Sequence, residues 1–165
     1  MLQAVFDAVD EYATRPFTVG YRFSPEEFTS PGINLADTFY LVDQLAETRV
    51  DYLHVSLDTY DRVATADGYQ EQSILAYLHD YLKDRKPLVG VGGVRTRQDV
   101  DAVLANADLV AVGQQLLVDP TWVQKLTAGH DDMVTGEFAD AIQYTSFTRP
   151  LYDFLVARYQ SEPNI

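Results

Sequence analysis

The chain contains no cysteine, and this absence removes several kinds of chemistry at once. Without thiols there is no disulfide, no thiolate nucleophile and no zinc or iron–sulfur site held by sulfur. Basic residues are also scarce, because 12 lysines and arginines face 25 aspartates and glutamates. The resulting net charge of −13 repels nucleic-acid phosphates and anionic lipid, so we expect neither nucleic acid nor membrane as a partner.

Long hydrophobic runs and signal-like segments are missing as well. No stretch of about 18 apolar residues occurs, and residues 1–10 hold no basic segment followed by an apolar run. These features, with the lack of cysteine, favour a soluble, cytoplasmic protein. A hydrophobic content of 47% over 165 residues is typical of one globular unit with a sizeable core.

Apolar residues recur with helical and strand-like spacing in turn along the chain. Helices are predicted within residues 2–13, 35–45, 69–83, 96–104 and 121–128, and strands near residues 17–22, 50–56, 87–92 and 108–113. Thr96 is expected to cap one helix, and Asp119 with Pro120 to begin another. The tail is expected to hold two short helices, around Phe138 and Phe154. Strands that alternate with helices of this length predict βαβ crossovers and a parallel sheet.

Alternation along the strands predicts which side chains face the helices and which face the interior. The larger side chains are expected to pack against the helices: Val19, Tyr21, Val89, Val91, Val110 and Val112. The other set is small apart from one arginine and is expected to face the interior: Gly20, Arg22, Gly90, Gly92, Ala111 and Gly113. His54 is expected on the ligand-facing side of its strand. Small residues at the carboxyl ends of the strands leave room for a ligand, where α/β barrels bind theirs.

Glycines follow two successive predicted strands. Gly92 and Gly93 directly follow one strand, and Gly113 ends the next. Each alone is compatible with a tight turn, but the paired placement is typical of a backbone site for phosphate, which TIM barrels build after their seventh and eighth strands. The predicted fold class is therefore α/β, with parallel (βα) units forming the C-terminal half of a TIM (βα)8 barrel. Residues 1–128 would supply four βα units, and residues 129–165 a helical tail of the same domain.

Three segments, in order, resemble one family. Residues 86–122 read KPLVGVGGVRTRQDVDAVLANADLVAVGQQLLVDPTW, which is similar to the closing part of old yellow enzyme and NADH:flavin oxidoreductase proteins. Residues 20–25, GYRFSP, resemble that family's fifth strand, and residues 51–56, DYLHVS, its sixth. The resemblance covers residues 1–128. It implies flavin mononucleotide (FMN) as cofactor and NAD(P)H as reductant.

The resemblance also implies roles for particular residues. Gly92, Gly93 and Gly113 match the glycines that hold the FMN phosphate in the family. Arg22 matches an arginine at the pyrimidine edge of the flavin, where a cation stabilises the negative charge of the reduced ring. After Gly113 the family usually has a phosphate-binding arginine, and this chain has Gln114 instead. A neutral amide thus replaces one charge-assisted contact.

The first four strands of the family's barrel have no counterpart in the sequence. The family's substrate-anchoring pair and proton-donating tyrosine lie there, so no catalytic residue is assigned, and no metal ligand either. We interpret the chain as part of an FMN-dependent, ene-reductase-like NAD(P)H:flavin oxidoreductase with a small-molecule substrate. Its cofactor-binding residues would be Arg22, Gly92, Gly93, Gly113 and Gln114.

Two alternatives bind no flavin. One is a non-catalytic phosphate-binding or self-assembling half-barrel module. The other is a fragment of a lyase or isomerase barrel that binds a sugar phosphate, against which Arg22 before Ser24 and Pro25 argues. In each case a half-barrel leaves sheet edges open, which predicts a homo-oligomer or a complementary N-terminal half-barrel as partner.

Overall fold

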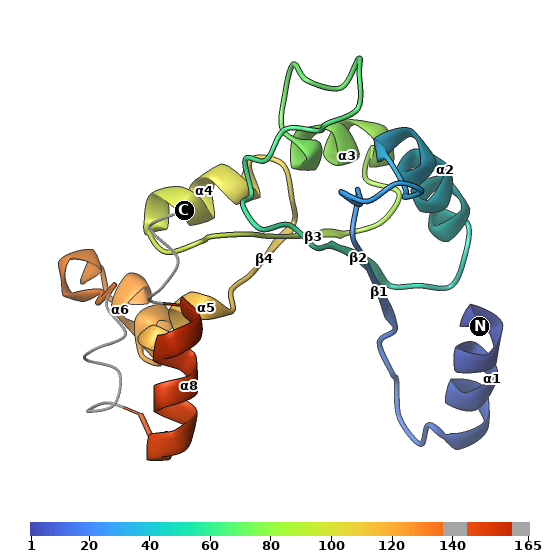
Figure 1. Cartoon of the computed structure of the whole chain (residues 1–165). Coiled ribbons are helices and arrows are strands. Elements are labelled where there is room, and N and C mark those ends of the chain that lie inside the picture. Colours follow the sequence, from blue (N-terminus) through green and yellow to red (C-terminus); the bar gives the residue numbers. More distant parts are fainter. Residues whose placement is uncertain (137–144, 160–165) are drawn as a thin grey trace.

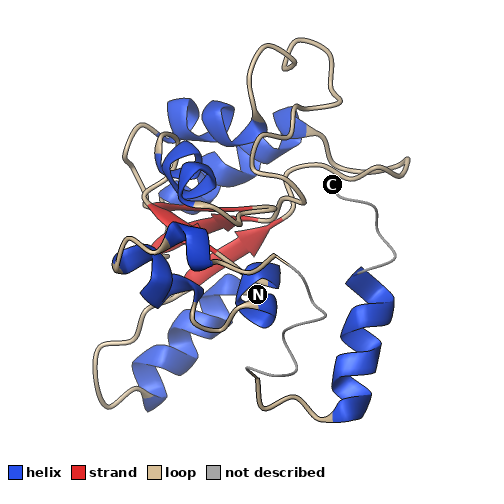
Figure 2. Cartoon of the chain, turned by 90° about the vertical axis from the view of Figure 1, so that its left-hand side faces the viewer, coloured by secondary structure: helices blue, strands red, loops and turns tan. Residues whose placement is uncertain are grey.

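A single parallel sheet organises the chain in the computed structural model, which describes residues 1–136 and 145–159. The strands are β1 (Gly20–Phe23), β2 (Tyr52–Val55), β3 (Leu88–Val91) and β4 (Leu109–Ala111), and they lie in chain order, each parallel to its neighbour. The intervening helices are α2 (Leu35–Ala46), α3 (Ile74–Leu82) and α4 (Arg97–Leu104), and they lie on one side of the sheet (Figure 1). Figure 2 shows the same helix layer above the sheet. This arrangement confirms the predicted α/β class.

Helices also precede and follow the sheet. They are α1 (Leu2–Tyr12), α5 (Gln114–Val118), α6 (Trp122–Thr127), the short 3-10 turn η1 (Asp131–Met133) and α8 (Arg149–Tyr159). Helix α8 contains Phe154 as expected, whereas the helix predicted around Phe138 lies outside the described residues. Leu155 of α8 packs against Val118 of α5. The division at residue 129 stays a prediction. No helix in the described part of the chain is long and apolar enough to span a membrane.

Side-chain caps explain where the crossover helices begin. Asn34 and Thr96 each form a capping box, with Asp37 and Asp99 respectively, which confirms the cap predicted at Thr96. Ser73 accepts a hydrogen bond from the Ala76 amide at 3.1 Å, so α3 begins at Ile74. The start predicted at residue 69 was wrong, because apolar spacing continued into the loop before this cap.

Two other predicted boundaries differ from the structure. Strand β1 begins at Gly20 rather than at residue 17. Asp119 is the C-cap residue of α5, a helix that was not predicted, and the N-cap residue of α6 is Thr121. The Asp119 carboxylate accepts hydrogen bonds from the Thr121 amide and hydroxyl, at 3.1 and 2.8 Å, and so shapes the turn between the two helices.

The faces of the sheet follow the predicted alternation on three strands and depart from it on β3. Leu53, which is fully buried, pairs in register with Leu88, and both face the helices. Gly90 lies on this same face, because a Cβ built there would be 2.6 Å from Val103 Cγ1 of α4. Val89 and Val91 therefore face the interior, the reverse of the prediction. Gly90 is small so that α4 can approach the sheet closely.

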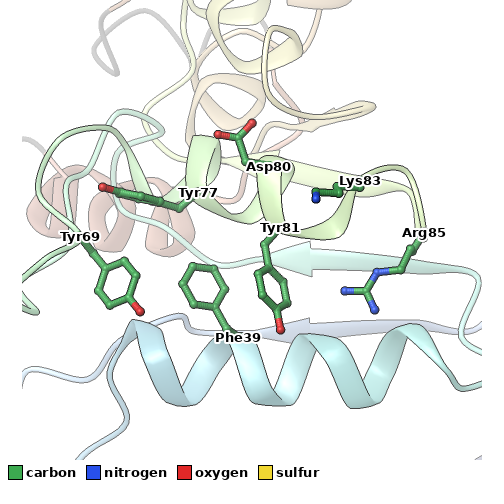
Figure 3. A pocket seen from close by; sticks show the side chains of 7 residues that line it. All are labelled: Phe39, Tyr69, Tyr77, Asp80, Tyr81, Lys83 and Arg85. Atoms are coloured by element: carbon green, nitrogen blue, oxygen red, sulfur yellow. The ribbon is translucent and has the colours of Figure 1, made fainter.

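Aromatic side chains close the contact between α2 and α3. Phe39 of α2 stacks on Tyr81 of α3, with ring centroids 4.6 Å apart, and meets the edge of Tyr69 at 5.4 Å. Figure 3 shows these rings between the two helices, with Tyr77 beside Tyr69 and Arg85 beyond Tyr81. Such pairs contribute beyond simple burial of area. They fix the outer helix layer that supports the strands.

Candidate functional site: a glycine-lined cavity at the strand ends

A cavity of about 180 Å³ lies at the carboxyl ends of three neighbouring strands. The loop after β3 contributes Gly92 and Gly93, and the segment after β4 contributes Gly113 and Gln114. The structure thus brings together four of the five predicted site residues. Arg22 does not line this cavity and lies on β1, two strands away from β3. The complete lining is Leu57, Asp58, Val91, Gly92, Gly93, Val94, Arg95, Ala111, Val112, Gly113 and Gln114.

Glycine is needed at Gly92 and Gly93 for backbone reasons. Their φ angles are +132° and +62°, a region that side chains disfavour. A Cβ at Gly92 would also lie 2.6 Å from the carbonyl carbon of Thr59, which is rigid main chain. The Gly92 carbonyl accepts a hydrogen bond from the Tyr60 amide at 3.1 Å, so the loop after β2 is fixed against the loop after β3.

Gly113 differs from these two glycines. Its φ is −114°, which other residues adopt, and no atom lies within 4 Å of a Cβ built there. Because Gly113 lines the cavity, any side chain at this position would project into open space beside the strand ends. What glycine provides here is room for a ligand rather than an unusual backbone angle.

The loop after β3 is held in place by contacts on both sides of Arg95. The Asp99 carboxylate accepts hydrogen bonds from the Arg95 and Thr96 amides, at 3.0 and 2.7 Å. The Trp122 indole donates to the Arg95 carbonyl at 2.7 Å. Burial alone would raise the pKa of Asp99, but these backbone contacts and the Tyr60 hydroxyl hold that pKa below its usual value. The carboxylate stays charged and the loop keeps its shape.

A buried carboxylate supports the other wall of the cavity. Asp119 accepts hydrogen bonds from Lys125 Nζ at 2.6 Å and from the Thr135 amide at 3.2 Å. Burial raises the pKa of Asp119, but the bonds from Lys125, Thr121 and Thr135 outweigh it and lower the pKa. Gln115 is buried and donates to the Thr135 carbonyl at 2.7 Å. Gln114, next to it, remains exposed at the cavity.

Arg22 and His54 face the open side of the sheet, where they pair in register on β1 and β2. Arg22 donates to Ser56 Oγ at 2.6 Å. Burial and the charge of Arg22 lower the pKa of His54, so the imidazole is neutral near pH 7. Its Nε2 atom is buried and has no hydrogen-bond partner within the described residues. Buried polar atoms are normally hydrogen-bonded, so this nitrogen is available to a ligand or a water molecule.

These features fit a ligand with a phosphate at one end and a polar ring at the other. Gly113 leaves open space at the strand ends, and the glycines of the two loops border that space with their backbone. Arg22 and the unpartnered His54 nitrogen lie on the interior face of the same sheet. FMN has this combination of groups, so the residues present are compatible with it.

The charged or loop residues Leu57, Asp58 and Arg95 were not assigned to the cavity from the sequence. Leu57 and Asp58 follow β2, and their place in the cavity depends on how that loop lies against Gly92. Arg95 could have been noticed, because it follows the Gly-Gly-Val segment directly and is a cation in a strongly acidic chain.

A parallel βα sheet with a glycine-lined cavity at its carboxyl edge is an architecture of the ligand-binding α/β barrel class. Residues 1–132 match the sequence profile of the NADH:flavin oxidoreductase / NADH oxidase family, and the chain belongs to that family.

Named relatives agree with this assignment. The chain is 35% identical over 135 residues to the Probable NADH-dependent flavin oxidoreductase YqiG of Bacillus subtilis (strain 168), covering 81% of this chain and 36% of the relative. It is 37% identical over 146 residues to the NADH:acrylate oxidoreductase of Vibrio harveyi, covering 86% of this chain and 14% of the relative. The chain therefore spans about a third or less of the length of these relatives.

A solved structure supports the fold. Histamine dehydrogenase from Rhizobium sp. 4-9 superposes with a TM-score of 0.57 at 18% sequence identity, over 81% of this chain and 19% of that chain. At this level of identity the likeness shows the fold alone, and the four βα units correspond to part of a TIM barrel.

Proposed function

We propose that this chain forms the FMN-phosphate half of an NAD(P)H-dependent flavin oxidoreductase barrel of the old yellow enzyme type. The observation that carries the proposal is the cavity at which Gly92, Gly93, Gly113 and Gln114 converge. Bound FMN supplies hydride transfer from a nicotinamide to an acceptor such as an activated alkene. The backbone amides at the cavity bind the phosphate, and this contact anchors the cofactor along the sheet.

Arg22 has a separate role in this proposal. Its guanidinium is fixed by Ser56 on the interior face, where it places a positive charge toward the ring end of the cofactor site. Such a charge favours the reduced, negatively charged ring. The neutral His54 next to it offers a hydrogen-bonding nitrogen without adding a second charge.

The barrel needs further βα units to close, and we propose that a complementary N-terminal half-barrel or a second copy supplies them. Within the described residues, strands β1 and β4 each pair with one neighbour, so both sheet edges are open there. Leu109 on β4 is 56% exposed, and α1 carries a groove whose lining includes the exposed Tyr12 and Phe17. If a second copy covers these surfaces, light scattering will give the mass of a dimer, and the contact should bury more than about 1,000 Å². A monomer that binds no complementary half would contradict this part of the proposal.

Flavin binding tests the function directly. The chain is titrated with FMN and with riboflavin, which share the ring and differ by the phosphate, and flavin fluorescence is followed. We expect FMN to bind at least about tenfold more tightly, since riboflavin lacks the charge-assisted contacts. Equal affinities would contradict a phosphate-anchored flavin. Binding of inorganic phosphate without either flavin would instead favour the non-catalytic phosphate-binding module.

A further inference from the structure

We propose that Arg95 supplies the cationic contact to the ligand phosphate that Gln114 lacks. This inference rests on the proposed function in one respect only, namely that the cavity binds a phosphate. Arg95 lies in the loop after β3 and lines the same cavity as Gln114. It is the one cation among the lining residues, all of which lie in the described part of the chain.

The guanidinium of Arg95 is available for a ligand. Several other arginines are paired, for example Arg97 with Asp131 at 2.9 Å and Arg62 with Glu26 at 3.3 Å. Within residues 1–136 and 145–159, by contrast, the Arg95 side chain has no hydrogen bond or ion pair.

The backbone of Arg95 is rigidly placed although its side chain is exposed. Its amide is bonded to Asp99 and its carbonyl to Trp122, so the side chain starts from a fixed point beside Gly93. The planar guanidinium can then bind a phosphate with two parallel N–H bonds.

The charge balance of the cavity also requires such a contact. Asp58 lines the same space, and its carboxylate is 3.4 Å from Arg62 Nη1 with the side chain 61% exposed. A phosphate monoester carries about −1.5 to −2 charges at pH 7, so Asp58 opposes its binding. Without Arg95, Asp58 would be the only charged residue that lines the cavity. With it the lining is neutral, and the backbone amides then favour phosphate.

Inorganic phosphate is the probe, and the amide resonances of Gly93 and Gly113 report its binding during an NMR titration. Arg95→Gln should weaken phosphate binding by about tenfold. The matched control is Arg15→Gln, because Arg15 is exposed, lies outside the cavity and gives the same change in net charge. We expect the control to shift the dissociation constant by less than about twofold. The phosphate dissociation constant of Arg95→Lys should lie between those of the wild type and Arg95→Gln, because lysine keeps the charge but cannot form two parallel N–H bonds.

Two further measurements separate a direct contact from a structural effect. Asp58→Asn should tighten phosphate binding, and the salt dependence of binding should be shallower in Arg95→Gln than in the wild type. The proposal is overturned if Arg95→Gln and Arg15→Gln bind phosphate equally, or if phosphate leaves the Gly93 and Gly113 amides unmoved. Arg95-dependent phosphate binding without flavin binding would refute the flavin function alone. Equal FMN binding by Arg95→Gln and wild type would refute the role of Arg95 alone.

Discussion

Gly90→Ala tests the packing that sets the position of β3 and therefore of the cavity. The added Cβ would lie 2.6 Å from Val103 Cγ1 and 3.1 Å from Leu75 Cδ2. Carbon atoms pack at about 3.5–4.0 Å, so the overlap with Val103 is about 1 Å. Overpacking of a core costs about 1–3 kcal/mol, and removing the glycine's freedom in the unfolded chain offsets about 0.4–1 kcal/mol. We expect the free energy of unfolding to fall by about 1–2 kcal/mol.

The assay is urea unfolding followed by the fluorescence of Trp122, which is buried and is the only tryptophan. Gly113→Ala is the matched control, because no atom lies near its added Cβ. This variant should lower the free energy of unfolding by less than about 0.5 kcal/mol. Combining Gly90→Ala with Val103→Ala should destabilise by less than the sum of the two single changes. An unchanged urea midpoint for Gly90→Ala, or strict additivity in the double variant, would refute the assigned face of β3.

Three other substitutions test the site and its supports. Gln114→Arg should tighten FMN binding about tenfold without affecting riboflavin, and equal FMN dissociation constants would count against the placement of the phosphate. Because the pKa of His54 is lowered, the unfolded chain binds more protons than the folded one. The urea midpoint of the wild type should therefore fall as the pH drops below about 6.5. The midpoint of His54→Gln should fall less over the same pH range, and identical pH profiles for the two proteins would contradict this. Asp119→Asn leaves Lys125 without its partner and should cost about 3 kcal/mol at pH 7. Because the pKa of Asp119 is lowered, its contribution to the free energy of unfolding is present above pH 3.8 and is lost as the pH falls further. If Asp119→Asn is as stable as the wild type at pH 7, Asp119 does not have this role.

Local signals in the sequence were sufficient for the sheet and for most of the cavity. The glycines after β3 and β4 converge because the carboxyl ends of parallel strands meet at one edge. The cap at Thr96 was readable from its side chain and from Asp99 three residues later.

Features that depend on contacts between distant segments were not predictable in the same way. Gly90 was placed on the wrong face because only the close approach of Val103 distinguishes its role from that of Gly92. Leu57 and Asp58 reach the cavity through a loop whose course is set by the bond from Tyr60 to Gly92. Alternation within one strand contains no information about either contact.

The most direct test of the central claim is to locate FMN on the chain by NMR. Isotopically labelled protein is titrated with FMN, and the amide shifts are mapped by residue. The account predicts that the largest shifts occur at Gly92, Gly93, Gly113 and Gln114, the residues that line the cavity at the strand ends. Shifts concentrated at the opposite, amino-terminal ends of the strands, or an unchanged spectrum at these four amides, would contradict it.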